Sequence, residues 1–369
     1  MRRAIVIVGM SRAETGIFFP NRIIADEASV KSDDCLSSST ITPPCELTLS
    51  ESCLRVEWIP EGPLQSTSDM TFRRLTDLLA RSKAKNLIIF ADDFGSTRHD
   101  ICFPDMMSDL FARFDFTMDV ALVVRPQVEQ LETAYLERTY EIAESRTFQN
   151  FVRRYGFSER YDHIALLSTW RRAAKNRIVV APYRDCGSHD PIMDRLVQAL
   201  DLKDQAIHLL SPRHGCHETA QSPGPMAVEA SRRLHALGLH RRISGHPRRI
   251  GQIINDLARA RELDTQKFSG NARDTFATIE AYHGKANEWL AATYWGSSWD
   301  TSVARAPRKR PNELADQFVE SDAEEAIERI VLWVLAHTKF QPPPHWLRQI
   351  DSLVERGIES IGELLGRPI

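Results

Sequence analysis

Cysteine is scarce in this chain, and the glycine patterns that mark the best-known nucleotide loops are missing. Only six of the 369 residues are cysteine, and no two have the C-x-x-C spacing of a zinc ribbon. Scattered thiols are typical of a reducing compartment, so we expect a cytoplasmic protein and no metal site. Neither G-x-x-x-x-G-K-[ST] nor G-x-G-x-x-G occurs, so neither a nucleoside triphosphatase loop nor a dinucleotide fingerprint is indicated.

The chain also lacks a strong net charge and a long apolar run. Its 47 basic and 50 acidic residues give a formal net charge of -3, so we expect no nucleic-acid partner. The apolar run that follows Arg3 stops at Gly9, which is too short for a signal peptide core or a membrane span. We therefore expect no transmembrane segment.

What the chain does have is a series of short apolar runs with the spacing of strands. Helical patterns lie between these runs, and near-continuous apolar strands that alternate with helices predict β-α-β crossovers. The fold class we expect is α/β, with a parallel sheet flanked by helices. The strands are predicted at Ala4 to Val8, Leu87 to Phe90, Val120 to Val124 and Arg177 to Ala181, and the helices at Phe72 to Ala80, Met106 to Phe114, Gln127 to Glu144 and His163 to Ala174.

The remaining sequence divides into an irregular segment and a helical portion. Residues 29–68 are rich in Ser, Thr and Pro with one strand-like run, Leu54 to Ile59, so we interpret them as an irregular insertion or a lid. We predict an α/β core over 1–212 and a helical C-terminal portion over 213–369. Its helices are expected at Met226 to Leu237, Gly251 to Glu262, Thr278 to Ala291, Ala323 to His337 and Trp346 to Leu365.

The first candidate binding site is the loop that begins at Gly9, directly after the first apolar run. A turn there would direct backbone N–H groups and a helix N-terminus toward an anion. Ser11, Arg12 and Thr15 would then add polar groups that suit a phosphate. An ordinary strand-to-helix turn explains the same residues equally well, so both interpretations stay open.

The second candidate site centres on Arg125, at the carboxyl end of a predicted strand. Ligands of open α/β sheets bind at that end of the strands, and Pro126 suits the first turn of the following helix. A guanidinium matches the geometry of a phosphate, and the Thr133 hydroxyl could donate to the same group. Under the alternative interpretation, Arg125 pairs with a carboxylate and Thr133 only fills space.

Several passages resemble the bacterial branch of the P-loop sulfotransferases, which use 3'-phosphoadenosine 5'-phosphosulfate. The resemblance is diffuse and covers roughly the first 340 residues. It implies a P-loop nucleotide-binding sheet and this nucleotide as the donor, with no metal. The passages are Ile5 to Arg12, Ile89 to Phe94, Arg125 to Gln127 with Thr133 and Tyr135, and Arg177 to Asp185, with Asn287 to Leu290 as a late segment.

The resemblance assigns roles to individual residues. Arg12 stands where the family has a lysine beside the 5'-phosphosulfate, and Arg125 with Thr133 matches the pair that holds the 3'-phosphate. Asp92 lies where the family commonly places a carboxylate that acts as general base. A cap after the strand explains Asp92 equally well, and His99 is a weaker alternative base.

The loop also departs from the family pattern, most seriously at Glu14. The family has glycine there, whereas a carboxylate repels a polyanionic donor and a Cβ hinders a tight turn. Arg12 keeps the positive charge but lacks the compact ammonium of lysine.

Two further clusters have simpler explanations. His214, Cys216, His217 and Glu218 crowd one loop, but no second ligand cluster accompanies them, so a metal site is not expected. Trp295 and Trp299 are interpreted as core or subunit contacts, with an aromatic wall around a sugar as the alternative.

Three functional hypotheses follow. The leading one is a sulfotransferase-like enzyme that moves a sulfuryl group to a hydroxyl of a carbohydrate or glycolipid, by positioning and charge stabilisation. The second, supported by Glu14, is a catalytically impaired family member that acts as a nucleotide-binding or interaction module. The third is a small-molecule kinase, which is weakened by the missing Walker lysine. Nothing in the sequence indicates an oligomeric state.

Overall fold

The computed structural model describes the residues that build the sheet and most of the helices. The described residues are 2–8, 24–25, 53–58, 75–82, 86–91, 103–183, 196, 198–201, 222–241, 247–260, 263–270, 273–303, 310–314 and 321–338. The chain forms two compact units. The first unit comprises Met1–Gln127, Phe157–Thr219 and Ile279–Ala306, and the second comprises Val128–Gly156, Ala220–Thr278 and Pro307–Ile369.

These two units are not consecutive stretches of the chain. They differ from the division into 1–212 and 213–369 that the sequence predicts, because residues 128–156 belong to the second unit and 279–306 to the first. Hydrophobic periodicity shows that a helix has a face to bury. It does not show which of two cores buries that face, so a division in chain order was the simplest expectation.

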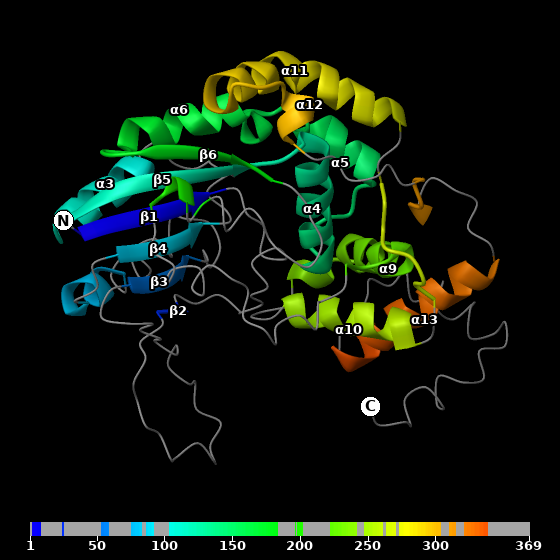
Figure 1. Ribbon diagram of the computed structural model, residues 1–369. Coiled ribbons are helices and arrows are strands. Elements are labelled where there is room, and N and C mark those ends of the chain that lie inside the picture. The colour runs from blue at the N-terminus through cyan, green and yellow to red at the C-terminus, as the bar shows by residue number, and fades with distance from the viewer. Residues whose placement is uncertain are drawn as a thin grey trace. The chain divides into compact units, whose positions relative to one another are not determined.

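The described strands form one sheet in the first unit (Figure 1), in the order β2-β3-β4-β1-β5-β6. All neighbouring pairs are parallel except β2 with β3, which is antiparallel at the edge. The predicted parallel sheet is thus confirmed, and β3 brings part of the segment 29–68 into it. The strands are β1 (Arg2–Val8), β2 (Ile24–Ala25), β3 (Cys53–Trp58), β4 (Asn86–Ala91), β5 (Phe116–Val124) and β6 (Ile178–Pro182).

Both faces of the central strands are buried. In β1, Ile5 and Ile7 on one face and Val6 and Val8 on the other are at most 1% exposed. Since successive side chains of a strand point to opposite faces, a run of β-branched residues can be stable here only if both faces are covered. This explains why the strands read as continuous apolar runs in the sequence.

Helices pack on the face that carries Val6 and Val8. They are a helix at 75–81, α3 (Phe103–Ala112), α6 (His163–Ala173) and part of α11 (Arg273–Trp295). Trp170 of α6 is fully buried and meets Phe103 of α3 edge to face, with ring centroids 6.5 Å apart. The large aromatic area buried between these two helices stabilises this side of the sheet.

A charged pair stands on the opposite face of the sheet. Asp119 of β5 is fully buried, and its carboxylate accepts hydrogen bonds from Arg3 at 2.6 Å and from Asn176 at 2.6 Å. Arg3 also donates to the carbonyl oxygen of Leu200. Because a buried carboxylate is costly unless it is paired, these donors account for an acid within an otherwise apolar strand.

The second unit is helical, which confirms a helical C-terminal part. Its helices include α4 (Gln127–Tyr140), whose first residue lies in the first unit, α5 (Phe148–Tyr155), α9 (Pro225–Ala236), α10 (Pro247–Ala260) and α13 (Ser321–His337). Helices α9, α10 and α13 share a core that contains Ile142, Leu234, Ile254, Ile327 and Val331. Of the three short helices, η4 (Leu239–Arg241) belongs to the second unit, whereas η2 (Glu159–Tyr161) and α12 (Trp299–Ser302) belong to the first.

Most predicted helices are present with shifted ends, whereas two details of the prediction were wrong. The helix predicted to run to Glu144 ends at Tyr140, because Ile142 adopts a positive φ of 53° that stops it. Helix α5 was not predicted, although Thr147 caps it by accepting a hydrogen bond from the Asn150 amide. The predicted helix Trp346 to Leu365 lies outside the described residues.

A close approach of α10 to the end of α4 gives a test of the second unit. A Cβ added at Gly251 would lie 1.9 Å from the carbonyl oxygen of Tyr140, whereas one added at Gly284 would meet nothing within 4 Å. Gly251→Ala should therefore lower the free energy of unfolding by about 3 kcal/mol, measured by urea denaturation. Gly284→Ala, the matched helical control, should raise it by about 1 kcal/mol. Equal effects of the two substitutions would contradict the packing described.

Candidate functional site

At the carboxyl ends of the adjacent strands β1 and β5, the chain continues toward opposite sides of the sheet. After β1 it continues toward β3 on one side, and after β5 it continues to β6 on the other. In open α/β sheets, ligands bind outside the carboxyl ends of strands where the connections diverge in this way. The ends of β1 and β5 therefore mark the candidate site.

The strand register shows which residues follow the strands at this edge. Val8, the last residue of β1, pairs with Ala91, the last residue of β4, so the segments after β1 and β4 leave the sheet at the same level. Val124, the last residue of β5, pairs with Pro182 of β6 in the same way. The predicted site residues Gly9, Ser11, Arg12, Thr15 and Asp92, together with Glu14 and His99, lie outside the described residues.

Arg125 directly follows β5 and is 8% exposed. Its guanidinium carbon lies 5.9 Å from the ring centroid of Tyr183, the residue that follows β6. The Tyr183 amide donates to the Val124 carbonyl at 2.7 Å and so extends the β5–β6 pairing to this point. An aromatic face near a guanidinium attracts the positive charge, so Tyr183 helps to hold the Arg125 side chain at the carboxyl edge.

His163, at the start of α6, holds the backbone of Arg125. Its Nε2 lies 3.0 Å from the Arg125 carbonyl oxygen, and its ring is 2% exposed. Burial is the main cause that lowers the pKa of His163 to about 4, and it outweighs the raising effect of the hydrogen bond with the Arg125 backbone, so the ring is neutral at pH 7. Since a carbonyl only accepts, the single ring proton must reside on Nε2 and is donated to Arg125.

The first residue of α4 is held by a second polar contact. The side-chain amides of Gln127 and Asn287 form two reciprocal hydrogen bonds, of 2.8 Å and 2.9 Å, and both residues are at most 4% exposed. Asn287 lies on α11, more than 150 positions away along the chain. The Arg125 carbonyl and the Gln127 side chain are thus each held by a side chain from another helix, α6 and α11.

Two tryptophans, Trp299 and Trp295, pack in series next to the His163 ring. The imidazole stacks on Trp299 with centroids 5.8 Å apart, and Trp299 lies 5.9 Å from Trp295. The indole Nε1 of Trp295 donates to the Val180 carbonyl of β6 at 2.8 Å. Trp299 is 5% exposed and belongs to the core of the first unit, which agrees with the interpretation of this residue as a core contact.

Thr133, the predicted partner of Arg125, is half-buried on α4. The division between the two units falls after Gln127, so Arg125 belongs to the first unit and Thr133 to the second. Their joint action on a phosphate stays a prediction.

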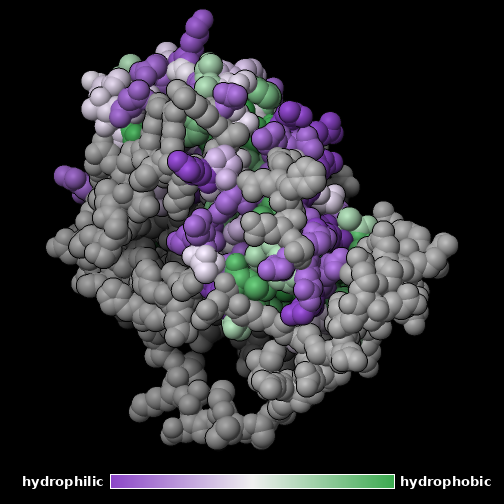
Figure 2. Space-filling model, turned by 90° about the vertical axis from the view of Figure 1, so that its right-hand side faces the viewer, coloured by the Kyte–Doolittle hydropathy of each residue, from purple (hydrophilic) through white to green (hydrophobic). Residues whose placement is uncertain are grey.

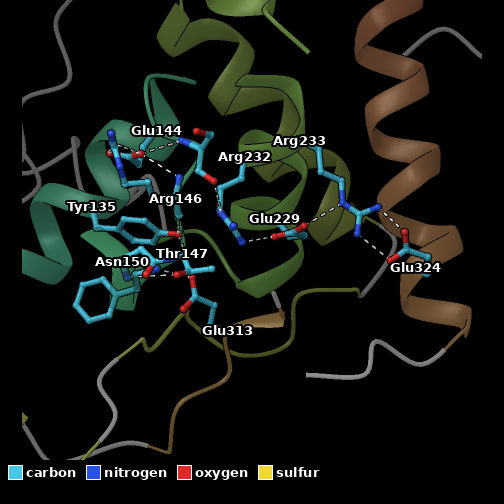
Figure 3. A network of polar contacts seen from close by, with 12 residues as sticks. Tyr135, Glu144, Arg146, Thr147, Asn150, Glu229, Arg232, Arg233, Glu313 and Glu324 are labelled. Atoms are coloured by element: carbon cyan, nitrogen blue, oxygen red, sulfur yellow. Dashed lines mark hydrogen bonds and ion pairs between the residues drawn. The ribbon is translucent and has the colours of Figure 1, made fainter. Parts of the chain in front are cut away.

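The second unit holds a separate polar network (Figure 3). The buried carboxylate of Glu313 accepts hydrogen bonds from the Tyr135 hydroxyl at 3.1 Å and from the Phe148 amide at 2.6 Å. Burial, followed by the charge of Glu313, raises the pKa of Tyr135 far above its usual range. Tyr135 is therefore a neutral donor that ties residues 310–314 to α4, which is a structural role.

Arginines extend this network toward the outer helices. Arg232 pairs with Glu229 at 2.6 Å, and Arg233 bridges Glu229 and Glu324 of α13. Each arginine is matched by a carboxylate, so the network balances its own charge. We do not assign a ligand to it.

The described residues bear on two other expectations. No group of three or more His, Cys, Asp or Glu side chains among them could hold a metal ion, and the loop with His214 and Cys216 lies outside them. Within the same residues, no helix has the length and apolarity needed to cross a membrane. Hydrophilic residues predominate among the described ones on the face in Figure 2.

Comparisons with known proteins add no relative: no family model, curated protein or solved structure matches this chain. The sequence singled out Arg125 as a candidate but did not indicate that His163 holds it or that Asn287 holds Gln127, the residue two positions on. The only signal available for them was an isolated polar residue on an otherwise apolar helix face, which is common in cores.

Burial of a neutral histidine makes the stability of the first unit depend on pH. The pKa of His163 is about 4 in the folded state and about 6.5 in the unfolded state, so only the unfolded chain gains its proton between these values. This residue should therefore cost up to about 3 kcal/mol of unfolding free energy as the pH falls from 7 to 4. Urea denaturation of wild type and His163→Phe measures the difference. A phenylalanine variant with an unchanged pH slope would disprove the assignment.

Proposed function

We propose that this chain is a sulfotransferase-like enzyme that uses 3'-phosphoadenosine 5'-phosphosulfate and sulfates a hydroxyl of a carbohydrate or glycolipid. The proposal places the donor at the carboxyl edge of β1 and β5. Arg125 binds its 3'-phosphate there together with Thr133. The loop with Gly9, Ser11, Arg12 and Thr15 binds the phosphosulfate end.

The single observation that carries the proposal is the position of Arg125 at the point where the sheet connections diverge. Taken in chain order, the five parallel strands have the spatial order second, third, first, fourth, fifth. This order, with the first strand between the third and the fourth, produces the divergence of connections beside which ligands bind in open α/β sheets. An arginine directly after the fourth of these strands then stands beside the carboxyl end of the first, where a phosphorylated ligand would bind.

The chemistry needs no resident metal. In an in-line attack the acceptor oxygen forms a bond to sulfur while the bond from sulfur to the donor phosphate oxygen breaks. Asp92 takes the acceptor proton, and adenosine 3',5'-bisphosphate leaves. Arg12 stabilises the charge that develops on the leaving oxygen. The chain supplies position and charge, which are the two factors that this transfer requires.

One sequence feature favours a second candidate function. Glu14 places a negative charge in the loop that should bind a polyanion, which suits a family member that has kept nucleotide binding but lost efficient transfer. Nothing comparable favours the small-molecule kinase, since no lysine follows a glycine loop in the sequence.

A thermal-shift titration with adenosine 3',5'-bisphosphate tests the donor site. At about 100 times the dissociation constant the ligand should raise the melting temperature by about 3 °C. Arg125→Ala should weaken binding about 100-fold because it removes a charge-assisted contact to phosphate. Arg172→Ala is the matched control. Arg172 is 53% exposed, lies at the opposite end of α6 from His163, and pairs with Asp105 of α3. Stabilisation by ATP with magnesium alone would instead favour the kinase.

The effect of Glu14 separates an impaired site from an absent one. Glu14→Gly removes a like charge and restores the glycine of the family pattern, so the affinity for adenosine 3',5'-bisphosphate should rise by about tenfold, measured by calorimetry. Glu14→Gln separates the contribution of charge from that of the Cβ. An affinity that changes in neither variant would show that the loop does not face the ligand.

A further inference from the structure

We propose that His163, Gln127 and Asn287 are positioning residues, which hold the Arg125 backbone and the first turn of α4 in the orientation that binds the anionic ligand. This inference rests on the proposed function, because it concerns the same site. These three buried side chains need not touch the ligand, yet they should affect how tightly Arg125 binds it.

These residues hold a short segment, Arg125 to Gln127, that joins β5 to α4. Pro126 has a fixed φ and no backbone N–H, so the direction in which Arg125 leaves β5 is set by what binds on either side of it. On one side His163 donates to the Arg125 carbonyl, and on the other Asn287 binds the Gln127 side chain twice. Two independent contacts thus fix three consecutive residues.

The groups that do the holding are themselves held in place. The Asp162 carboxylate caps α6 by accepting from the amides of Ile164 at 2.8 Å and Ala165 at 3.3 Å, which fixes the backbone beside His163. Trp299 stacks on the imidazole, and the Trp299 amide donates to Glu288 of α11 at 3.1 Å. The donor to Arg125 therefore has little freedom to move.

Buried amides and imidazoles lose their bonds to water, so these contacts add little net stability compared with well-packed apolar side chains. What these contacts add is a fixed orientation of the groups that they join, since a hydrogen bond is lost when its donor and acceptor shift. A misplacement of about 1 Å is enough to reduce the rate or affinity of a preorganised site by one or two orders of magnitude.

The test separates positioning from stability by pairing variants. Asn287→Leu leaves the Gln127 amide without its partner, and the double variant Gln127→Leu with Asn287→Leu replaces both polar groups by apolar ones. The double variant should regain thermal stability relative to Asn287→Leu. Its affinity for adenosine 3',5'-bisphosphate, measured by calorimetry, should stay about tenfold below that of wild type. Recovery of both quantities would overturn the positioning role.

His163 is tested with a conservative rescue. His163→Phe keeps an aromatic ring against Trp299 but loses the donor, so the dissociation constant should rise about tenfold, whereas His163→Gln retains an N–H near the Nε2 position and should recover most of the affinity. In an Arg125→Ala background, His163→Phe should have no further effect. Asn176→Ala removes a 2.6 Å hydrogen bond to Asp119 before β6 begins and is the control, with an expected affinity within twofold of wild type.

The outcomes distinguish this inference from the proposed function. If Arg125→Ala abolishes binding while the folded His163→Phe and double leucine variants bind like wild type, positioning is wrong and the donor site stands. If Arg125→Ala binds like wild type, or wild type itself does not bind, the proposed function fails and the inference fails with it.

Discussion

The central place of β1 in the sheet is the constraint on which the candidate site depends. β1 lies between β4 and β5, and its side chains are buried on both faces. After the carboxyl end of β1 the chain continues toward β3 on one side of the sheet, and after β5 it continues to β6 on the other side. This divergence creates a place where backbone amides and the first residues of helices can face a ligand without interrupting the strand pairing. Arg125 stands at that place because β5 ends one residue before it.

A charged side chain beside an apolar core needs more than its location in the strand order. Arg125 is almost fully buried, its carbonyl is bound by a neutral histidine, and an aromatic ring lies near its guanidinium. Burial produces that neutral state, since desolvation is the largest cause that lowers the pKa of His163. The same apolar surroundings that stabilise the first unit thus keep the ring neutral, and the Arg125 carbonyl then places the remaining proton on Nε2. The core of the first unit therefore both buries the His163 ring and keeps it in the neutral form that donates to Arg125.

The second unit shows how differently polar groups are used away from the sheet edge. Its buried Glu313 accepts hydrogen bonds from the Tyr135 hydroxyl and the Phe148 amide, and its arginines pair with carboxylates. These contacts connect α4, α9 and α13 and residues 310–314, as expected for polar groups that brace a helical core. In the first unit, the contacts made by His163 and Asn287 instead converge on one short segment next to a strand end. This difference is why the proposed function rests on Arg125 rather than on the richer network around Glu313.

The sequence by itself determined most of the elements and the position of Arg125 at the carboxyl end of a strand. Apolar runs gave β1, β4, β5 and β6 within a few residues, and the position of Arg125 after such a run placed it at a carboxyl end. Local patterns suffice for this because strand and helix periods depend on neighbouring residues. The order of the strands, the grouping of α4 and α5 with the C-terminal helices, and the contacts of Arg125 with His163 and of Gln127 with Asn287 were decided only by the tertiary structure. These features join residues dozens to more than a hundred positions apart, and a lone histidine or asparagine on an apolar helix face does not reveal which distant group will satisfy it.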